Sequence, residues 1–182
     1  MKILSCGAGM QSTALALMSC ENKKEIKYKE VPIYDAVIFC DLGSEPIWVY
    51  KQVDFIKNAC EDAEIPFYIL DTHLHQDYLN NFGKRRVVSI PFWSVDENGK
   101  KGKMMRNCTL DYKINEIIKF VKYKLLGYAK YQRVKNEDLK AHEMHLGFSL
   151  EEKHRCKENK HKMFVNKFPL VDMELTRADN YK

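Results

Sequence analysis

The sequence predicts an α/β protein with an open, Rossmann-like parallel sheet and helices on both faces, and two observations carry this prediction. Apolar runs and helix-forming segments alternate over the first 70 residues in the order strand, helix, strand, helix, strand, which is typical of βαβ units. The second apolar run, residues 35–40, is almost uninterrupted, as expected for a strand covered on both faces. Right-handed crossovers would then place both helices against the sheet.

The first half of the chain has regular elements. Residues 2–6 are expected to form the first strand, and a glycine-rich turn follows. Residues 12–20 have helix formers with the spacing of a buried helix. A proline before residues 47–60 suits the first turn of a second helix, and residues 66–70 predict a third strand.

The second half is less regular. An irregular or hairpin insertion is expected around residues 85–105, because Asn98-Gly99 favours a tight turn. Apolar residues recur at helical spacing over 110–126, which predicts a helix. We further expect a strand over 142–148, a short helix opened by a capping box at 149–152, an extended segment over 164–170 and a helix start at 176–179.

Composition limits the classes of protein. A chain of 182 residues suits a single domain over residues 1–182, and a helix start so close to Lys182 suggests a truncated or shortened chain. No apolar run is long enough to cross a membrane, and no signal peptide is present, so we expect a cytoplasmic protein. The six cysteines are too widely and irregularly spaced for a typical zinc site, so we expect free thiols, several of them in the core, and no metal centre.

Positive charge is concentrated in two segments, although the net charge is only +5. One segment covers residues 100–106 and the other covers residues 153–162. Such clusters suit the phosphates of a nucleotide or of a nucleic acid. A solvated basic surface is the alternative, and the charge pattern alone does not decide between them.

The turn Gly7–Ser12 has the features of an anion site. It joins a strand to a helix, its glycines allow phosphates to approach the backbone, and the helix start offers unpaired N–H groups. The dinucleotide fingerprint does not fit, because Ser12 stands where a third glycine is needed. The Walker pattern does not fit either, because no Gly-Lys-Ser/Thr follows.

A third pattern does fit, since the turn resembles the S-G-G-x-D-S motif of PP-loop ATP pyrophosphatases and phosphoadenylyl-sulfate (PAPS) reductases. Gly9 and Ser12 match the motif, while Gly7, Ala8 and Gln11 replace its first serine, first glycine and aspartate. The form of the turn resembles the PAPS-reductase-like branch of bacteria and their phages. Further similar segments are residues 39–46, 89–93, 106–114, 147–152, 168–172 and 176–179.

The resemblance implies a fold like that of the adenine nucleotide alpha-hydrolases and a role in sulfur or adenylyl transfer. The expected ligand is ATP, AMP, adenylyl sulfate or PAPS, with Mg²⁺ left open. The implied enzyme is a PAPS-reductase-like oxidoreductase or an ATP pyrophosphatase-type transferase. Gln11 replaces a carboxylate and no C-terminal reductase cysteine motif is present, so an iron–sulfur cluster is not supported. Two alternatives stay open: a PP-loop enzyme that adenylates or thiolates a nucleic acid, and a non-catalytic nucleotide-binding regulatory module.

The candidate residues follow from the turn and from the resemblance. Arg106 and Lys113 would neutralise sulfate or phosphate, and Cys108 is a candidate reactive thiol beside them. These three are the catalytic candidates, whose roles are not assigned. The nucleotide-binding candidates are Ser5, Gly7, Ala8, Gly9, Met10, Gln11, Ser12, Asp41, Gly43, Glu45, Arg106, Lys113, Arg155 and Arg177.

Each candidate also has a structural alternative. Asp41 and Glu45 would contact ribose, adenine or Mg²⁺, or else cap the following helix. Cys108 is more simply a buried or capping cysteine, and the two later arginines are equally well surface charges. His73 and His75 are not expected to bind metal. Trp48, Trp93 and the tyrosines are expected in the core, and assembly into homo-oligomers stays open.

Overall fold

The computed structural model describes residues 1–72, 74–81, 93–103 and 110–181. The chain divides into two compact units. The first comprises Met1–Phe39, Glu45–Ile69 and Ala129–Lys182, and the second comprises Cys40–Ser44 and Leu70–Tyr128.

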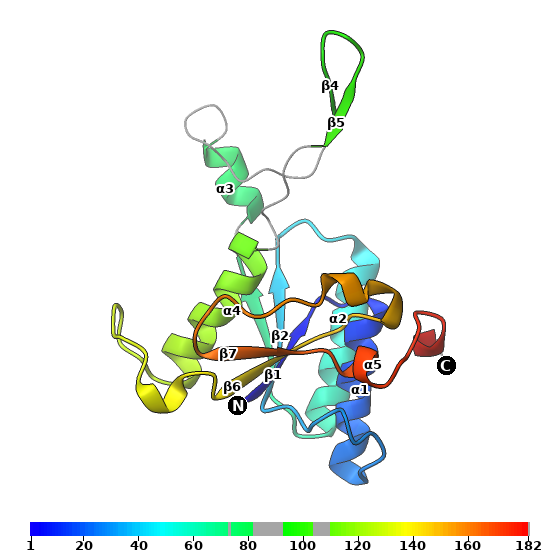
Figure 1. Ribbon diagram of the computed structural model, residues 1–182, viewed down its shortest axis with the longest axis vertical. Helices are drawn as coiled ribbons and strands as arrows, with labels where there is room; N and C mark the ends of the chain where they lie inside the picture. Colours follow the sequence, from blue (N-terminus) through cyan, green and yellow to red (C-terminus); the bar gives the residue numbers. More distant parts are fainter. Residues whose placement is uncertain (73, 82–92, 104–109, 182) are drawn as a thin grey trace. The chain divides into compact units, whose positions relative to one another are not determined.

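The central feature is a five-stranded parallel sheet in the order β3-β2-β1-β6-β7 (Figure 1). Its strands are β1 Lys2–Cys6, β2 Ala36–Asp41, β3 Phe67–Asp71, β6 His142–Leu146 and β7 Phe164–Lys167. Strand β1 pairs with β2 through Leu4 opposite Val37, and with β6 through Leu4 opposite His145. The parallel α/β fold expected from the sequence is therefore confirmed, and its strand order reverses between β1 and β6.

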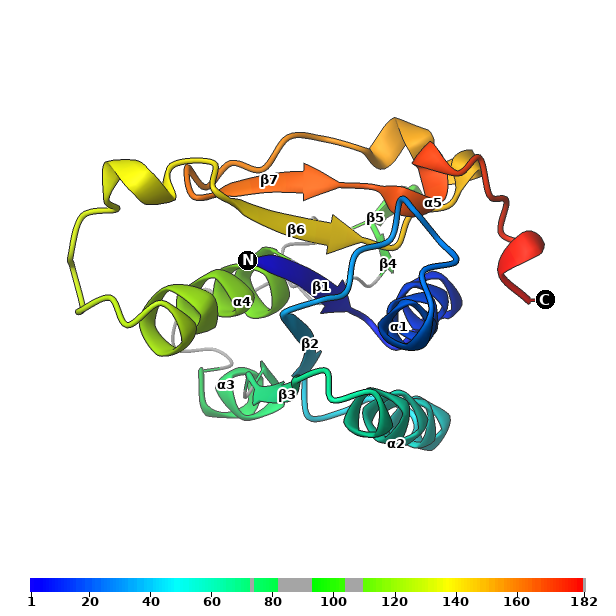
Figure 2. The ribbon, with the colours of Figure 1, turned by 90° about the horizontal axis from the view of Figure 1, so that it is seen from below.

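Two helices of the first unit, α1 Met10–Lys24 and α2 Ile47–Asp62, lie on the same side of the sheet (Figure 2). The core between them and the strands includes Leu4 and Phe39 from the sheet, Leu15 from α1 and Ile56 from α2. In β2 the residues from Ala36 to Cys40 are all buried, so both faces of this strand are covered, as expected from its apolar run.

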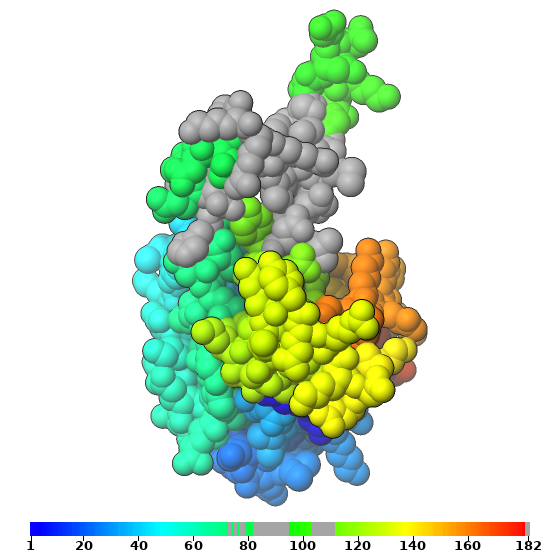
Figure 3. All heavy atoms as spheres, turned by 90° about the vertical axis from the view of Figure 1, so that its left-hand side faces the viewer, coloured from blue at the N-terminus to red at the C-terminus, as the bar shows by residue number. Residues whose placement is uncertain are grey.

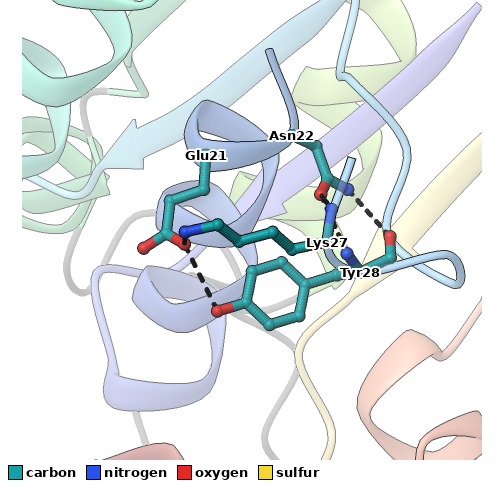
Figure 4. A network of polar contacts seen from close by, with 4 residues as sticks. All are labelled: Glu21, Asn22, Lys27 and Tyr28. Carbon is teal, nitrogen blue, oxygen red and sulfur yellow. Dashed lines mark hydrogen bonds and ion pairs between the residues drawn. The ribbon is translucent and has the colours of Figure 1, made fainter. Parts of the chain in front are cut away.

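Helix α1 is longer than expected and continues to Lys24. The polar segment after it folds back onto the helix through Asn22, whose side chain is 4% exposed. The Asn22 amide donates to the carbonyl oxygens of Tyr28 and Val31 at 2.8 and 2.7 Å. Its oxygen accepts from the N–H groups of Lys27 and Tyr28 at 2.8 and 2.9 Å (Figure 4). Glu21 adds an exposed ion pair with Lys27.

After β6 the first unit is less regular than expected. The helix opened by the predicted capping box is a 3₁₀ helix, η4 Leu150–Arg155, and Ser149 forms no side-chain cap bond. The segment expected to be extended over 164–170 ends as a strand at Lys167 and continues as the short helix α5 Pro169–Asp172. The helix start near the C-terminus is the 3₁₀ helix η5 Asp179–Tyr181. The 3₁₀ helix η3 Asn136–Asp138 belongs to a largely exposed loop (yellow in Figure 3).

The second unit contains the predicted hairpin, β4 Trp93–Val95 paired antiparallel with β5 Lys101–Lys103. Gly99 adopts φ +78° in its turn, as the Asn-Gly signal requires. Helix α3 Leu74–Asn81 precedes it. The helix expected over 110–126 is present, but π-helical turns, η1 Leu110–Ile114 and η2 Val121–Leu125, flank α4 Asn115–Phe120. Within the insertion expected around residues 85–105, residues 85–92 and 104–105 lie outside the described residues, as does Thr109, which would cap the helix predicted over 110–126.

Candidate anion-binding site

The turn between β1 and α1 starts directly after Cys6, and α1 begins at Met10. Gly9 is the helix N-cap with φ −85° and ψ 167°, and it offers no side-chain cap. Ala8 is buried and has φ +52°, a left-handed conformation that favours glycine.

The Ser12 side chain holds the turn together through hydrogen bonds to its backbone. Its hydroxyl accepts a hydrogen bond from the Gly7 N–H at 3.2 Å and donates to the Gly9 carbonyl at 3.0 Å. The same carbonyl accepts from the Thr13 hydroxyl and N–H at 2.9 and 3.0 Å. The Ser12 hydroxyl therefore shapes the backbone of the turn, in addition to any contact it makes with a ligand.

The turn is open on the side of its glycines. A Cβ atom built on Gly7 or Gly9 would meet no described atom within 4 Å. Within the described ranges, no group accepts a hydrogen bond from the N–H groups of Gly9, Met10 or Gln11. The first turn of α1 contains no acidic residue, so no side chain of that turn neutralises the positive end of the helix dipole.

The loop after β6 packs against the other side of the turn. A Cβ on Gly147 would lie 2.7 Å from the Ser12 nitrogen and 2.9 Å from the Gln11 carbonyl carbon. Only glycine allows this approach between two backbones. The sequence around Gly147 gives no sign of this role, because no local pattern shows that a residue 135 positions after Ser12 reaches the turn.

Gln11 is connected to the same loop through its side chain. Its Nε2 donates to Glu152 Oε2 at 3.1 Å, and the other oxygen of Glu152 pairs with Arg155. The Arg155 guanidinium lies 4.5 Å from the centre of the Phe148 ring, which stacks on Phe168 at 5.8 Å. The structure thus connects the candidate Arg155 with the turn, through Glu152 rather than directly.

Arg177 is held by its backbone. Its N–H donates to both carboxylate oxygens of Glu151 at 3.1 Å, and its side chain is exposed. Hydrogen bonds from the N–H of Glu151 itself and then from that of Arg177 lower the pKa of the Glu151 carboxyl. Glu45, in the same unit, is half-buried just before α2, whose N-cap is Pro46. Ser5 lies within β1, opposite Ile38 and Leu146.

Three candidates lie in the described part of the second unit. Asp41 ends β2, and its Oδ1 accepts from the Gly43 N–H at 2.8 Å. Gly43 has φ +80°, so this pair forms a turn that needs glycine, and Asp41 is not the α2 cap. The carbonyl of Lys113 accepts a hydrogen bond from Cys40 Sγ at 3.6 Å. Burial raises the pKa of the Cys40 thiol to about 12. Arg106 and Cys108 lie outside the described residues.

A cleft of about 450 Å³ begins at the turn, between α1, α2 and the C-terminal segment. Ala8 and Met10 line its inner end, and Gln52 donates to the Thr13 hydroxyl at 3.3 Å along its wall. Trp48 also lines it and is 69% exposed. The expectation that Trp48 belongs to the core is wrong, because α2 turns Val53 and Ile56 toward the sheet instead.

Other sequence expectations concern cysteines, metals and membranes. Cys6, Cys20, Cys40 and Cys60 are free and buried, and Cys156 is free and half-buried, as expected. Among the described residues, no three His, Cys, Asp or Glu side chains are grouped as a metal site. None of the helices in these ranges combines the length and apolar character of a membrane span.

Comparison with protein-family models finds no match, and comparison with curated protein sequences finds none either. The fold and the turn define an α/β protein that has a five-stranded parallel sheet and an open glycine turn after its first strand.

Proposed function

We propose that the turn between β1 and α1 binds the phosphate groups of an adenine nucleotide. The observation that carries this proposal is the pair Gly7 and Gly9. Neither has a left-handed backbone, and neither has a described neighbour where a Cβ would stand. The fold does not require glycine at these positions, whereas a ligand that approaches the backbone would require it.

The chemistry of the turn suits a phosphate. Gly9, Met10 and Gln11 present N–H groups that lack acceptors among the described residues, at the positive end of a 15-residue helix. Such groups bind phosphate oxygens through hydrogen bonds and through the helix dipole. The resemblance of the turn to PP-loop proteins supports adenine as the base and sulfur or adenylyl transfer as the reaction.

The adjoining cleft supplies room for the rest of a nucleotide. Its volume of about 450 Å³ falls within the usual range for sites of small ligands. The exposed ring of Trp48 offers an apolar surface on which a heterocyclic base would stack. Gln52 and Asn180 supply amide groups on the walls of the same cleft.

Calorimetric titration with ATP, AMP, adenylyl sulfate and PAPS tests the proposal. We expect at least one of them to bind with a Kd below about 1 mM, and expect Gly7→Val to weaken that binding at least tenfold, because its side chain fills the open side of the turn. Absence of binding by all four nucleotides, with and without Mg²⁺, would overturn the proposal. Turnover that is lost in Ser12→Ala would show an enzyme rather than a regulatory module.

A nucleic acid is the second candidate ligand, and the charge of η4 and the following loop favours it. This segment exposes a run of basic side chains: Lys153, His154, Arg155, Lys157 and Lys160. Phosphate contacts release counterions, so binding to tRNA or DNA would fall steeply with salt. Filter binding between about 50 and 300 mM salt, a roughly sixfold range, checks this, and no retention at the lowest salt would exclude it.

A further inference from the structure

Two buried thiols face each other between the helices that support the turn. Cys20 lies near the end of α1 and Cys60 near the end of α2, and their sulfur atoms are 3.9 Å apart. Cys60 is 0% exposed and Cys20 is 8% exposed. Both belong to the core between the helices and the sheet. In a disulfide the sulfur atoms are about 2.05 Å apart, so a short approach of two side chains would join them.

We propose that Cys20 and Cys60 form a redox pair that hydrogen peroxide converts into a disulfide between α1 and α2. The proposal does not depend on the nucleotide site. It rests on the contact between the two thiols and on the 8% exposure of Cys20, the side from which a small oxidant would reach the pair.

The surroundings assign different roles to the two cysteines. The hydrogen bond with Cys60 lowers the pKa of the Cys20 thiol, and Lys24, one helical turn further on, acts in the same direction. The hydrogen bond with Cys20 and burial raise the pKa of the Cys60 thiol. Because the thiolate is the nucleophile and Cys20 is also the more exposed of the two, at 8% against 0%, Cys20 reacts first and Cys60 resolves the product.

The reaction proceeds in two balanced steps. The Cys20 thiolate attacks one peroxide oxygen, the O–O bond breaks, and the leaving hydroxide takes up the thiol's proton as water, which leaves a sulfenic acid on Cys20. Cys60 then gives up its proton and displaces hydroxide from the Cys20 sulfur, so that the S–S bond forms and a second water leaves. Two thiols lose two electrons, and one peroxide gains them.

Peptide mapping tests the proposal on the full-length protein. After peroxide treatment and alkylation without reductant, trypsin should release residues 3–23 linked to residues 58–84. Since Cys6 lies on the same tryptic peptide as Cys20, single variants assign the bond. We expect the linked peptide in wild type, Cys6→Ser and Cys156→Ser, and expect it to be absent in Cys20→Ser and in Cys60→Ala.

The thermal midpoint gives a second readout. The link closes a span of 40 residues, so the Tm of the oxidised protein should rise by roughly 5–15 °C and return after dithiothreitol. Circular dichroism checks that each variant is folded. The proposal is overturned if wild type gives no linked peptide while the half-buried Cys156 is fully oxidised. A link that persists in Cys20→Ser would overturn it as well, because Cys6 would then be the partner of Cys60.

Discussion

At the scale of single residues, Gly7 in the turn and Gly147 next to it differ in how much space surrounds them. Substitution of each by alanine should therefore have different effects on stability. In Gly147→Ala the new Cβ would stand 2.7–3.0 Å from backbone atoms of Gln11 and Ser12. Backbone cannot move aside cheaply, so we expect a loss of about 1–3 kcal/mol in the free energy of unfolding. Gly7→Ala, with nothing within 4 Å, should change it by less than about 0.5 kcal/mol. Urea denaturation of both variants measures the difference, and equal losses would contradict the described packing.

His145 predicts how stability depends on pH. It is 3% exposed on β6, its Nε2 is 3.1 Å from Glu143, and Tyr34 packs against its ring at 5.1 Å. Burial lowers the pKa of His145 below 6.5, and Lys2 and Lys167 act in the same direction against the effect of Glu143. The unfolded chain titrates at the ordinary pKa. The stability contributed by neutral His145 is therefore present above pH 6.5 and is lost as the pH falls through the lower pKa of the folded state.

Urea denaturation at pH 7.5 and pH 5.0 checks this sign. The protein that retains His145 should lose more stability between the two values than His145→Phe, which keeps the ring contact and removes the titrating group. The other carboxylates that respond to pH are common to both proteins and cancel in the comparison, except for Glu143, which contacts His145 and is therefore replaced by Gln in both proteins. An equal loss in the two proteins would refute the assignment to His145.

At the scale of elements, Asn22 holds the end of α1 to the segment that follows. Asn22→Ala would remove four hydrogen bonds, although the Tyr28 carbonyl would still accept from the Val31 N–H, and this should cost about 3 kcal/mol of unfolding free energy. The matched control is Glu21→Gln, which removes the exposed ion pair with Lys27, keeps an acceptor for the Tyr28 hydroxyl, and should cost less than about 1 kcal/mol. A shift of the urea midpoint in Asn22→Ala no larger than that of the control would contradict this role.

The connection between α1 and η4 predicts an electrostatic effect on the proposed site. Glu152 accepts from Gln11 and pairs with Arg155, so it brings a negative charge to the edge of the turn. Glu152→Gln keeps an acceptor for Gln11 and removes that charge. We expect nucleotide affinity without Mg²⁺ to rise about three- to tenfold at low salt, measured by calorimetry. Unchanged affinity in a protein that does bind nucleotide would show that Glu152 lies too far from the bound phosphates.

The elements also show what local sequence can and cannot predict. The strands and both helices of the first unit were predictable to within a few residues, because burial on one or both faces imposes a period on the sequence. The π-helical turns around α4 were not, since they keep a nearly helical apolar spacing. The close contact of Gly147 with the backbone of the turn and the hydrogen bond between Gln11 and Glu152 join segments more than 130 residues apart. No local sequence pattern predicts such contacts. The prediction that Trp48 lies in the core is wrong because the local sequence around an exposed tryptophan beside a cleft does not differ from that around a buried one.

At the scale of the whole molecule, the strand order predicts a marked effect of truncation. A chain that ends at residue 140 lacks β6 and β7 and leaves β1 with an unpaired edge. Exposed edges of apolar strands associate with one another, so we expect this fragment to sediment as aggregate while the full chain stays in the supernatant. Centrifugation followed by gel analysis measures both. A monomeric, folded fragment would show that β1 and β2 suffice.

The same strand order determines when, during translation, β1 gains its second partner strand. During synthesis, strand β1 receives its second neighbour only when residues 142–146 have emerged, well after β1 itself and after the whole middle region of the sequence. Until then the nascent chain exposes an apolar strand whose N–H and C=O groups are unpaired along one edge. Slow translation of the middle region would lengthen this exposure, and chaperones that shield nascent chains should matter most during that interval.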